Sequence, residues 1–219
     1  MNHGHTAETL IAFEQRIVGL FAAGKLPFLV HLSGGNEAQL LEIFRDVQPG
    51  DWIFSGHRSH YHYLLAGGNE DHLEKLIRDG RSMFVFDRKI NFVTSSILAG
   101  VCCPAAGVAL ALKQAGSASR VWCFVGDGGE DNGHFCEAVR YAEGHGLPVR
   151  YIVEDNDRQV DTSYRERWGT ERRWQWDNSP NVMRYHYTPT FPHGGAGLPA
   201  GSVKFRPEIV ERFANRGRS

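Results

Sequence analysis

The sequence predicts an α/β fold, in which a parallel sheet carries helices on both faces. Two apolar segments, residues 121–125 and 148–153, have the composition of buried strands, and residues 132–145 between them have the pattern of a helix. A strand, a helix and a second strand in succession form the βαβ unit that joins parallel strands. Because parallel strands are buried on both faces, helices are expected on both sides of this sheet.

Helices are also predicted at four places upstream of the βαβ unit, at residues 6–23, 36–44, 69–79 and 104–115. The first has apolar side chains at helical spacing. The third begins at Asn69, a good N-cap residue, and ends before Gly80. The fourth has Pro104 in its first turn and Gly116 beyond its end, the usual placement of these two residues.

Length and composition indicate one globular domain with an attached segment. The chain has 219 residues, of which 42% are hydrophobic and 22% charged. We expect residues 1–162 to form the main domain. Residues 163–219, rich in Arg and Trp and with a short helix predicted at 208–214, complete that domain or form an interface. An interface is favoured over single-stranded nucleic acid, because Trp and Arg are enriched at interfaces and the net charge is only −1.

Two observations predict where the chain resides. Its four cysteines have no paired spacing, and the first residues lack the pattern of a secretory signal, so we expect a cytoplasmic protein without a disulfide framework. Residues 91–112 carry no charge and are long enough to span a bilayer. Polar side chains and Pro104 interrupt this stretch, and we expect no membrane span.

A glycine-rich turn follows the first strand of the βαβ unit, where Gly126, Gly128 and Gly129 surround Asp127. The carboxyl edge of an open α/β sheet is where ligands bind, and glycines let backbone N–H groups approach a phosphate. Asp127 would repel a phosphate unless a divalent cation lay between them. Asn156 follows the second strand at the same edge, so carboxylate and amide oxygens could hold Mg²⁺ there.

Two simpler interpretations of this turn remain open. A Gly-Asp-Gly segment is often only a turn. A dinucleotide-binding turn is the other alternative, but residue 131 is Asp where the G-x-G-x-x-G pattern requires Gly, and no P-loop pattern occurs in the chain.

The motif, taken with its surroundings, resembles a known family. Residues 126–128 (GDG) and 154–156 (EDN) resemble the GDG…(E/D)NN signature of thiamine diphosphate enzymes. The likeness extends over most of residues 28–162. It is closest to the alpha subunit of 2-oxoacid dehydrogenases and, second, to the N-terminal domain of transketolase. Residues 31–38 (HLSGGNEA) are similar to the alpha-subunit segment HLYDGQEA, and residues 51–60 (DWIFSGHRSH) to its D-x-x-x-x-x-Y-R-x-H pattern.

The resemblance implies thiamine diphosphate and Mg²⁺ as cofactors, with a role for each matched residue. The residues that it places around the metal are Asp127, Asn156 and Arg158, the last through its backbone carbonyl. The residues that it places around the thiamine diphosphate are His57, Arg58, Ala99, Gly126, Gly128, Gly129 and Asn156. It places His31 and His60 near the thiazolium and the substrate carboxylate as catalytic residues. His57 stands where the family often has Tyr.

The resemblance also implies a partner and a reaction. The chain would be the alpha-like half of a two-component enzyme that decarboxylates a 2-oxoacid and transfers the acyl or aldehyde unit. A beta-like subunit would supply the pyrimidine-binding domain and the Glu that activates the cofactor, so this chain alone would be inactive. The alternatives are a split transketolase-like subunit acting on a ketose, and a non-catalytic homologue that serves as a binding or regulatory subunit.

Overall fold

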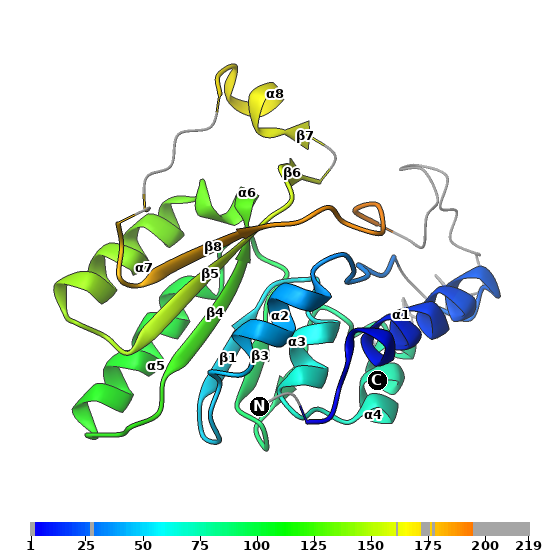
Figure 1. The fold of residues 1–219 in the computed structure, drawn as a ribbon, viewed down its shortest axis with the longest axis horizontal. Helices are drawn as coiled ribbons and strands as arrows, with labels where there is room; N and C mark the ends of the chain where they lie inside the picture. Colours follow the sequence, from blue (N-terminus) through cyan, green and yellow to red (C-terminus); the bar gives the residue numbers. More distant parts are fainter. Residues whose placement is uncertain (1–2, 27–28, 161, 172–175, 177, 195–219) are drawn as a thin grey trace, which may run out of the picture.

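A mostly parallel sheet forms the centre of the protein (Figure 1). The computed structural model describes residues 3–26, 29–160, 162–171, 176 and 178–194. Within these residues the sheet has six strands in the order β2-β3-β1-β4-β5-β8. The strands are β1 (Trp52–Ser55), β2 (Phe86–Asp87), β3 (Phe92–Thr94), β4 (Val121–Gly126), β5 (Val149–Asp155) and β8 (Val182–His186). Neighbouring strands run parallel, except that β2 and β3 are antiparallel.

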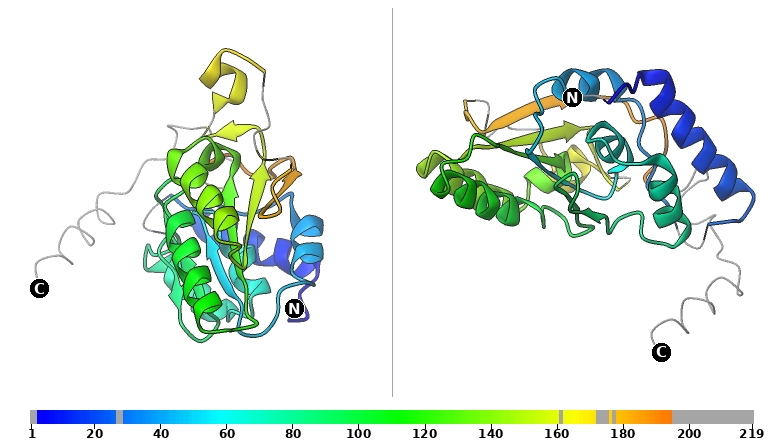
Figure 2. Two further views of the ribbon diagram at one scale, coloured as in Figure 1. Left: turned by 90° about the vertical axis from the view of Figure 1, so that its left-hand side faces the viewer. Right: turned by 90° about the horizontal axis from the view of Figure 1, so that it is seen from below.

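Helices cover both faces of this sheet, which confirms the predicted fold class (Figure 2). Helices α5 and α7 pack on one face and α1 to α4 on the other. The helices are α1 (Ala7–Ala22), α2 (Glu37–Ile43), α3 (His60–Leu65), α4 (Glu70–Arg78), α5 (Cys102–Gln114), α6 (Asp127–Glu130), α7 (Gly133–Gly144) and α8 (Tyr164–Trp168). A small antiparallel hairpin, β6 (Arg158–Gln159) and β7 (Thr162–Ser163), precedes α8.

Strand β4 shows why the central strands are apolar throughout. Val121, Cys123 and Val125 pack into the core shared with α5 and α7. Trp122 and Phe124 pack into the opposite core, beneath α1 to α4. Every side chain of this run is therefore buried, as expected for a strand between two helical layers.

The predicted helices agree with the structure to within two residues at their ends. Asn69 caps α4, and its side chain accepts a hydrogen bond from the backbone N–H of His72. Asn132 caps α7 in the same manner through the backbone N–H of His134. Helix α5 begins at Cys102, so that Pro104 lies inside its first turn rather than at its first position.

Strand β8 is an element that the sequence analysis did not predict. Residues 182–186 pair in parallel with β5, from Tyr151 opposite Val182 to Asp155 opposite His186. The strand mixes exposed and covered side chains and includes a charged one, so it lacks the continuous apolar run that revealed β4 and β5. The division at residue 162 stays a prediction, and the helix predicted at 208–214 lies outside the described residues.

The described part of the chain contains no helix that combines the length and the apolar character needed to cross a membrane. The uncharged stretch at residues 91–112 is divided among β3, a loop and α5. A cytoplasmic location stays a prediction.

Candidate cofactor and metal site

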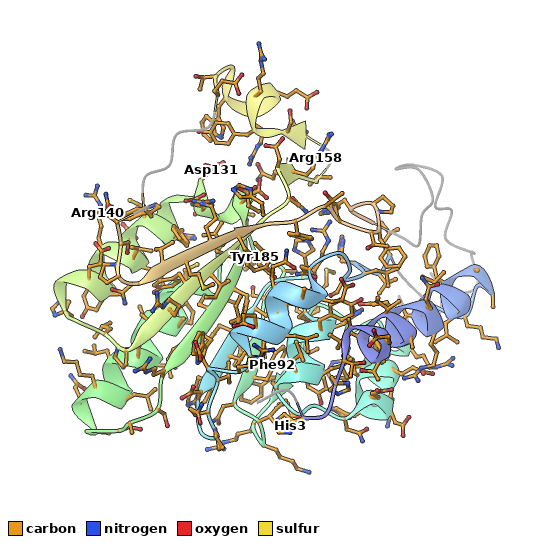
Figure 3. The ribbon with its side chains drawn as sticks, viewed as in Figure 1. His3, Phe92, Asp131, Arg140, Arg158 and Tyr185 are labelled. Carbon is orange, nitrogen blue, oxygen red and sulfur yellow. The ribbon has the colours of Figure 1, made fainter. Side chains whose placement is uncertain are left out.

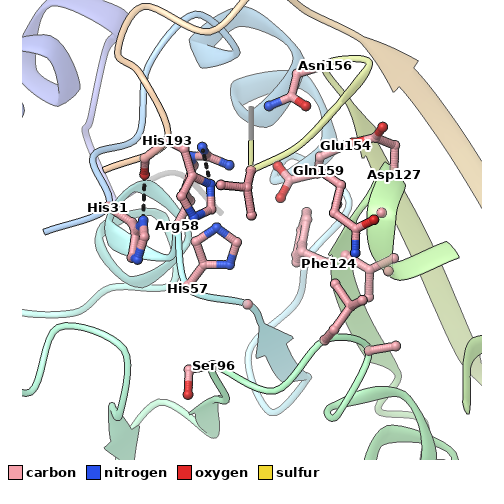
Figure 4. Close-up of a pocket in the computed structure, with 18 of the residues that line it drawn as sticks. His31, His57, Arg58, Ser96, Phe124, Asp127, Glu154, Asn156, Gln159 and His193 are labelled. Atoms are coloured by element: carbon pink, nitrogen blue, oxygen red, sulfur yellow. Dashed lines mark hydrogen bonds between the residues drawn. The ribbon is translucent and has the colours of Figure 1, made fainter. Parts of the chain in front are cut away.

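A cavity of about 320 Å³ lies at the carboxyl ends of β1, β4 and β5 (Figure 4). This is the edge of the sheet at which open α/β folds bind ligands. The wall of this cavity contains all but one of the predicted site residues. They are His31, His57, Arg58, Ala99, Gly126, Asp127, Gly128, Gly129, Asn156 and Arg158.

One side of the cavity is rich in oxygen atoms. The parallel register sets Gly126 opposite Glu154, so that the residues following β4 and β5 lie side by side. Asp127 is buried at the start of α6 and lines the cavity, as does Asn156. The Asn156 side-chain carbonyl accepts a hydrogen bond from the backbone N–H of Arg158 at 3.0 Å, which fixes the turn. A carboxylate, an amide oxygen and a nearby backbone carbonyl are the hard ligands that suit Mg²⁺.

The glycine turn keeps its backbone accessible to the cavity. A Cβ atom at Gly126 would meet no atom within 4 Å, and one at Gly129 would meet its nearest neighbour only at 3.6 Å. At Gly128 a Cβ atom would lie 2.8 Å from Cγ of Gln159, whose side chain covers this glycine. The open backbone at Gly126 and Gly129 fits a phosphate group, whereas Gln159 covers the backbone at Gly128.

The opposite side of the cavity is rich in nitrogen atoms. The imidazole rings of His31, His57 and His193 pack edge to face or tilted, with centroids 4.6 to 5.3 Å apart. Nδ1 of His31 donates to the backbone carbonyl of His193 at 2.5 Å. Nη2 of Arg58 donates to Nδ1 of His193 at 3.3 Å.

Two of these histidines, His31 and His57, have pKa values below the ordinary value. Burial lowers the pKa of His57 to about 2, and the positive charge of Arg58 contributes. Burial also lowers the pKa of His31, against the opposing effect of its hydrogen bond to His193. Among the described residues, Nε2 of His57 is buried without a hydrogen-bond partner. Neutral imidazoles beside a guanidinium provide donors and a positive charge for an anion.

A transition metal ion is the other possible ligand of this nitrogen-rich side. One nitrogen of each of His31, His57 and His193 lies within 4.8 Å of the others, which is a workable spacing for three imidazole ligands. The Arg58 guanidinium contacts His193 directly and would repel such an ion. The charge therefore favours an anion.

Comparison with known proteins identifies the family of this chain. The sequence model of the family described as "Dehydrogenase E1 component" matches residues 5–174. The chain belongs to this family. It is 31% identical over 161 residues to the pyruvate dehydrogenase E1 component subunit alpha of Rickettsia prowazekii, a match that covers 69% of this chain and 49% of that protein.

Two acetoin:2,6-dichlorophenolindophenol oxidoreductase alpha subunits are equally similar. That of Cupriavidus necator is 32% identical over 165 residues (71% of this chain, 50% of that protein), and that of Bacillus subtilis 32% over 154 residues (66% and 46%). The chain thus spans about half the length of the curated relatives it matches. The predicted resemblance to the alpha subunit of 2-oxoacid dehydrogenases is confirmed, and this family implies thiamine diphosphate as the cofactor.

His60 is the one predicted site residue that does not line the cavity. Its side chain is fully buried in α3. Nδ1 contacts the Glu14 carboxylate at 2.8 Å and Nε2 contacts the Ser82 hydroxyl at 2.8 Å. Both ring nitrogens are therefore engaged inside the protein, and the catalytic role of His60 stays a prediction.

Sequence reasoning assigned no site role to several cavity residues, and His193 and Glu154 are two of them. His193 follows a Pro in an irregular segment, and no pattern in the sequence connects it with residues 31 and 57. Glu154 is a charged residue near the end of the apolar strand β5, which is a usable signal. One oxygen of Glu154 accepts hydrogen bonds from His62 and Asn36, each at 3.1 Å, and from the Tyr185 hydroxyl.

Proposed function

We propose that this chain is the alpha-like, cofactor-anchoring subunit of a thiamine diphosphate- and Mg²⁺-dependent enzyme that acts on a 2-oxoacid. The observation that carries the proposal is the arrangement in Figure 4, where Asp127 and Asn156 face Arg58 and the histidines across one cavity. In a metal–diphosphate complex, the oxygen-rich side would attract the cation and the nitrogen-rich side would attract the diphosphate anion.

The metal would be held by Asp127, Asn156 and the backbone carbonyl of Arg158. The diphosphate would lie on the backbone of Gly128 and Gly129. Gly129 has room on this side, and the Gln159 side chain, which covers Gly128, would move aside. Mg²⁺ dehydrates reluctantly and is usually bound by one or two protein carboxylates or amides together with substrate phosphates. A site with few side-chain ligands and a phosphate-binding turn fits that preference.

The other end of the diphosphate would meet the nitrogen-rich side. Arg58 would form charge-assisted hydrogen bonds with its oxygens. His57 would donate from a neutral ring, since burial keeps its pKa low. His193 would donate through Nε2, because its Nδ1 accepts from Arg58. The fixed contact between Arg58 and His193 holds these donors in place before the ligand arrives.

His31 would act on the substrate side. Because Nδ1 faces a backbone carbonyl, which can only accept, Nδ1 carries the proton of the neutral ring. Nε2 is then an acceptor and can take a proton from a substrate or intermediate in the cavity. When bound, thiamine diphosphate would supply the electron sink that decarboxylation of a 2-oxoacid requires.

A beta-like partner would complete the site. Ile97 and Leu98 line the cavity and are 68% and 41% exposed, and Phe84 and Phe86 are also exposed near the β2 edge of the sheet. Exposed apolar side chains beside a ligand cavity are typical of a protein interface. The partner would bring the pyrimidine-binding domain and the activating Glu.

The test is binding and reconstitution. With Mg²⁺ present, the chain should bind thiamine diphosphate by calorimetry, and decarboxylation of a 2-oxoacid should require a beta-like subunit of this family. Formation of products from a ketose instead would favour the transketolase-like alternative. Failure to bind thiamine diphosphate with or without a partner would favour the non-catalytic homologue.

A further inference from the structure

Arg167 lies against the carboxylate that is proposed to bind the metal. It belongs to α8, the short helix that lies beyond α6 in Figure 1, and its side chain is 10% exposed. Nη2 lies 3.5 Å from Oδ2 of Asp127, and Nη1 lies 3.1 Å from Oδ2 of Asp131. Figure 3 shows Asp131 and Arg158 at this end of the molecule. One buried guanidinium thus serves two carboxylates.

The same side chain reaches the diphosphate turn through one intermediary. Nη1 of Arg167 donates to Oε1 of Gln159 at 2.8 Å. Gln159 lines the cavity and covers Gly128, where a Cβ atom would lie 2.8 Å from its Cγ. Arg167 is therefore one side chain removed from the backbone on which a diphosphate would lie.

Two donors of this guanidinium lack a hydrogen-bond acceptor among the residues that the structure describes. Nε and Nη2 of Arg167 are buried and make no hydrogen bond to any residue that the structure describes. A buried Arg keeps its charge, and unsatisfied buried donors are costly. Additional anionic oxygens near Gln159 would interact favourably with this charge and with these donors.

The contact between Arg167 and Asp127 is an ion pair rather than a hydrogen bond, because Nη2 and Oδ2 are 3.5 Å apart. A divalent cation on Asp127 would be only a few ångströms from the guanidinium, in a site where water screens little. The repulsion weakens binding of the cation alone. A diphosphate that arrives with the cation has the opposite sign and removes this penalty.

We propose that Arg167 is an internal counterion of Asp127, which weakens binding of a bare divalent cation and makes tight metal binding depend on a diphosphate anion. This inference rests on the proposed function, because it takes Asp127 as the metal ligand. In this proposal α8 contributes to the site, because its residue Arg167 lowers the affinity for a divalent cation alone.

The experiment measures Mn²⁺ binding to this chain by electron paramagnetic resonance, with and without thiamine diphosphate. Arg167→Gln should lower the dissociation constant for Mn²⁺ alone about tenfold. The factor by which thiamine diphosphate strengthens Mn²⁺ binding should shrink in this variant. Arg167→Lys keeps the charge and should stay within about threefold of the unmodified chain. An unchanged or higher dissociation constant for Mn²⁺ alone in Arg167→Gln overturns the proposal.

Two controls separate this inference from the proposed function. Arg165 is on the same helix, is 78% exposed and pairs with the equally exposed Glu171, so Arg165→Gln should leave Mn²⁺ binding unchanged. Asp127→Asn should abolish Mn²⁺ binding. If Asp127→Asn binds Mn²⁺ as the unmodified chain does, the metal site itself is wrong. If it fails to bind while Arg167→Gln is unaltered, only the role of Arg167 is wrong.

A measurement that leaves Arg167 in place covers the case in which Arg167→Gln does not fold. The Trp168 indole N–H donates to Oδ2 of Asp131 at 3.0 Å, so this Trp shares a partner with Arg167. The Trp168 fluorescence, taken as the difference from Trp168→Phe, should change when Mg²⁺ and thiamine diphosphate are both added. A full change at the same Mg²⁺ concentration without thiamine diphosphate contradicts the proposal.

Discussion

The two sides of the cavity differ in how the chain assembles them. Asp127 and Asn156 follow neighbouring strands of one βαβ unit, and the register of β4 and β5 alone brings them together. His31 and His193 lie 162 residues apart and meet through a hydrogen bond between loops. The oxygen-rich side is thus determined locally, whereas the nitrogen-rich side depends on packing across the whole domain. The two sides should respond separately to mutation and to pH.

The largest expected effect comes from the oxygen-rich side. Asp127→Asn removes the carboxylate proposed as a metal ligand and should weaken Mg²⁺-dependent binding of thiamine diphosphate by about 100-fold or more, since loss of a supporting residue alone costs roughly 10–100-fold. Calorimetry in the presence of Mg²⁺ measures this change. Glu143→Gln, at an exposed site on α7, is the matched control. Unchanged affinity in Asp127→Asn would show that the metal lies elsewhere.

Arg58→Met tests the nitrogen-rich side. A charge-assisted contact of this kind contributes about 1.5–3 kcal/mol, so affinity for thiamine diphosphate should fall roughly 10–100-fold. Affinity for Mn²⁺ alone should not fall, because Arg58 carries a positive charge. Arg140→Met, at an exposed site on α7, should change neither affinity. If Arg58→Met lowered the affinities for Mn²⁺ and for thiamine diphosphate equally, the two sides of the cavity would not act independently.

A third variant, Gly35→Ala, disturbs the loop contact that places His193. Gly35 has φ +91°, and a Cβ atom there would lie 2.0 Å from the backbone carbonyl of Thr188. We expect a loss of about 1–3 kcal/mol in the free energy of unfolding, with a several-fold loss of affinity for thiamine diphosphate. Gly107→Ala in α5 meets no atom within 4 Å and should be neutral or stabilising. Denaturant unfolding checks both variants; full stability in Gly35→Ala would contradict the expectation.

The effect that is smallest near neutral pH is a dependence of stability on pH that arises from the nitrogen-rich side. The pKa of His57 is about 2 in the folded chain against an ordinary value of 6.5, so between these values only the unfolded chain binds the proton. The stability that neutral His57 confers is complete above pH 6.5 and declines as the pH falls toward 2. One such group contributes a slope of at most about 1.4 kcal/mol per pH unit.

His57→Gln should reduce this slope between pH 6 and pH 4, as measured by denaturant unfolding at each pH. His134→Gln, at an exposed position, should leave the slope unchanged. A slope that is identical in His57→Gln and in the unmodified chain would mean that His57 is protonated in the folded state.

The same contrast explains how far the sequence could be used for prediction. The sequence predicts β4, α7 and β5 because the apolar pattern of each is visible within a few residues. Asp127 and Asn156 could be predicted as site residues because each follows the end of a strand. His193 was not predictable, because the path of its loop depends on distant contacts such as the backbone hydrogen bond from Thr190 to Gly34 at 3.2 Å.

His60 illustrates the other limit of sequence reasoning. In α3 every residue from His60 to Leu65 is buried, so polarity does not indicate which side faces the cavity. The packing of α3 against Glu14 and Ser82 turns the ring away from the ligand site. Such an orientation depends on elements that lie far apart in the chain.

The position of β8 has a consequence for synthesis of the protein. Residues 182–186 pair with β5, so β5 presents an unpaired strand edge until that segment has left the ribosome. An open apolar edge is a site at which another nascent chain can add a strand. Two polar contacts fasten the entry to β8 once it arrives, because the Asn181 amide donates to the backbone carbonyls of Leu147 and Val149. Once residues 182–186 are synthesised, β8 thus covers the edge at which misassembly would otherwise begin, and Asn181 anchors the start of that strand.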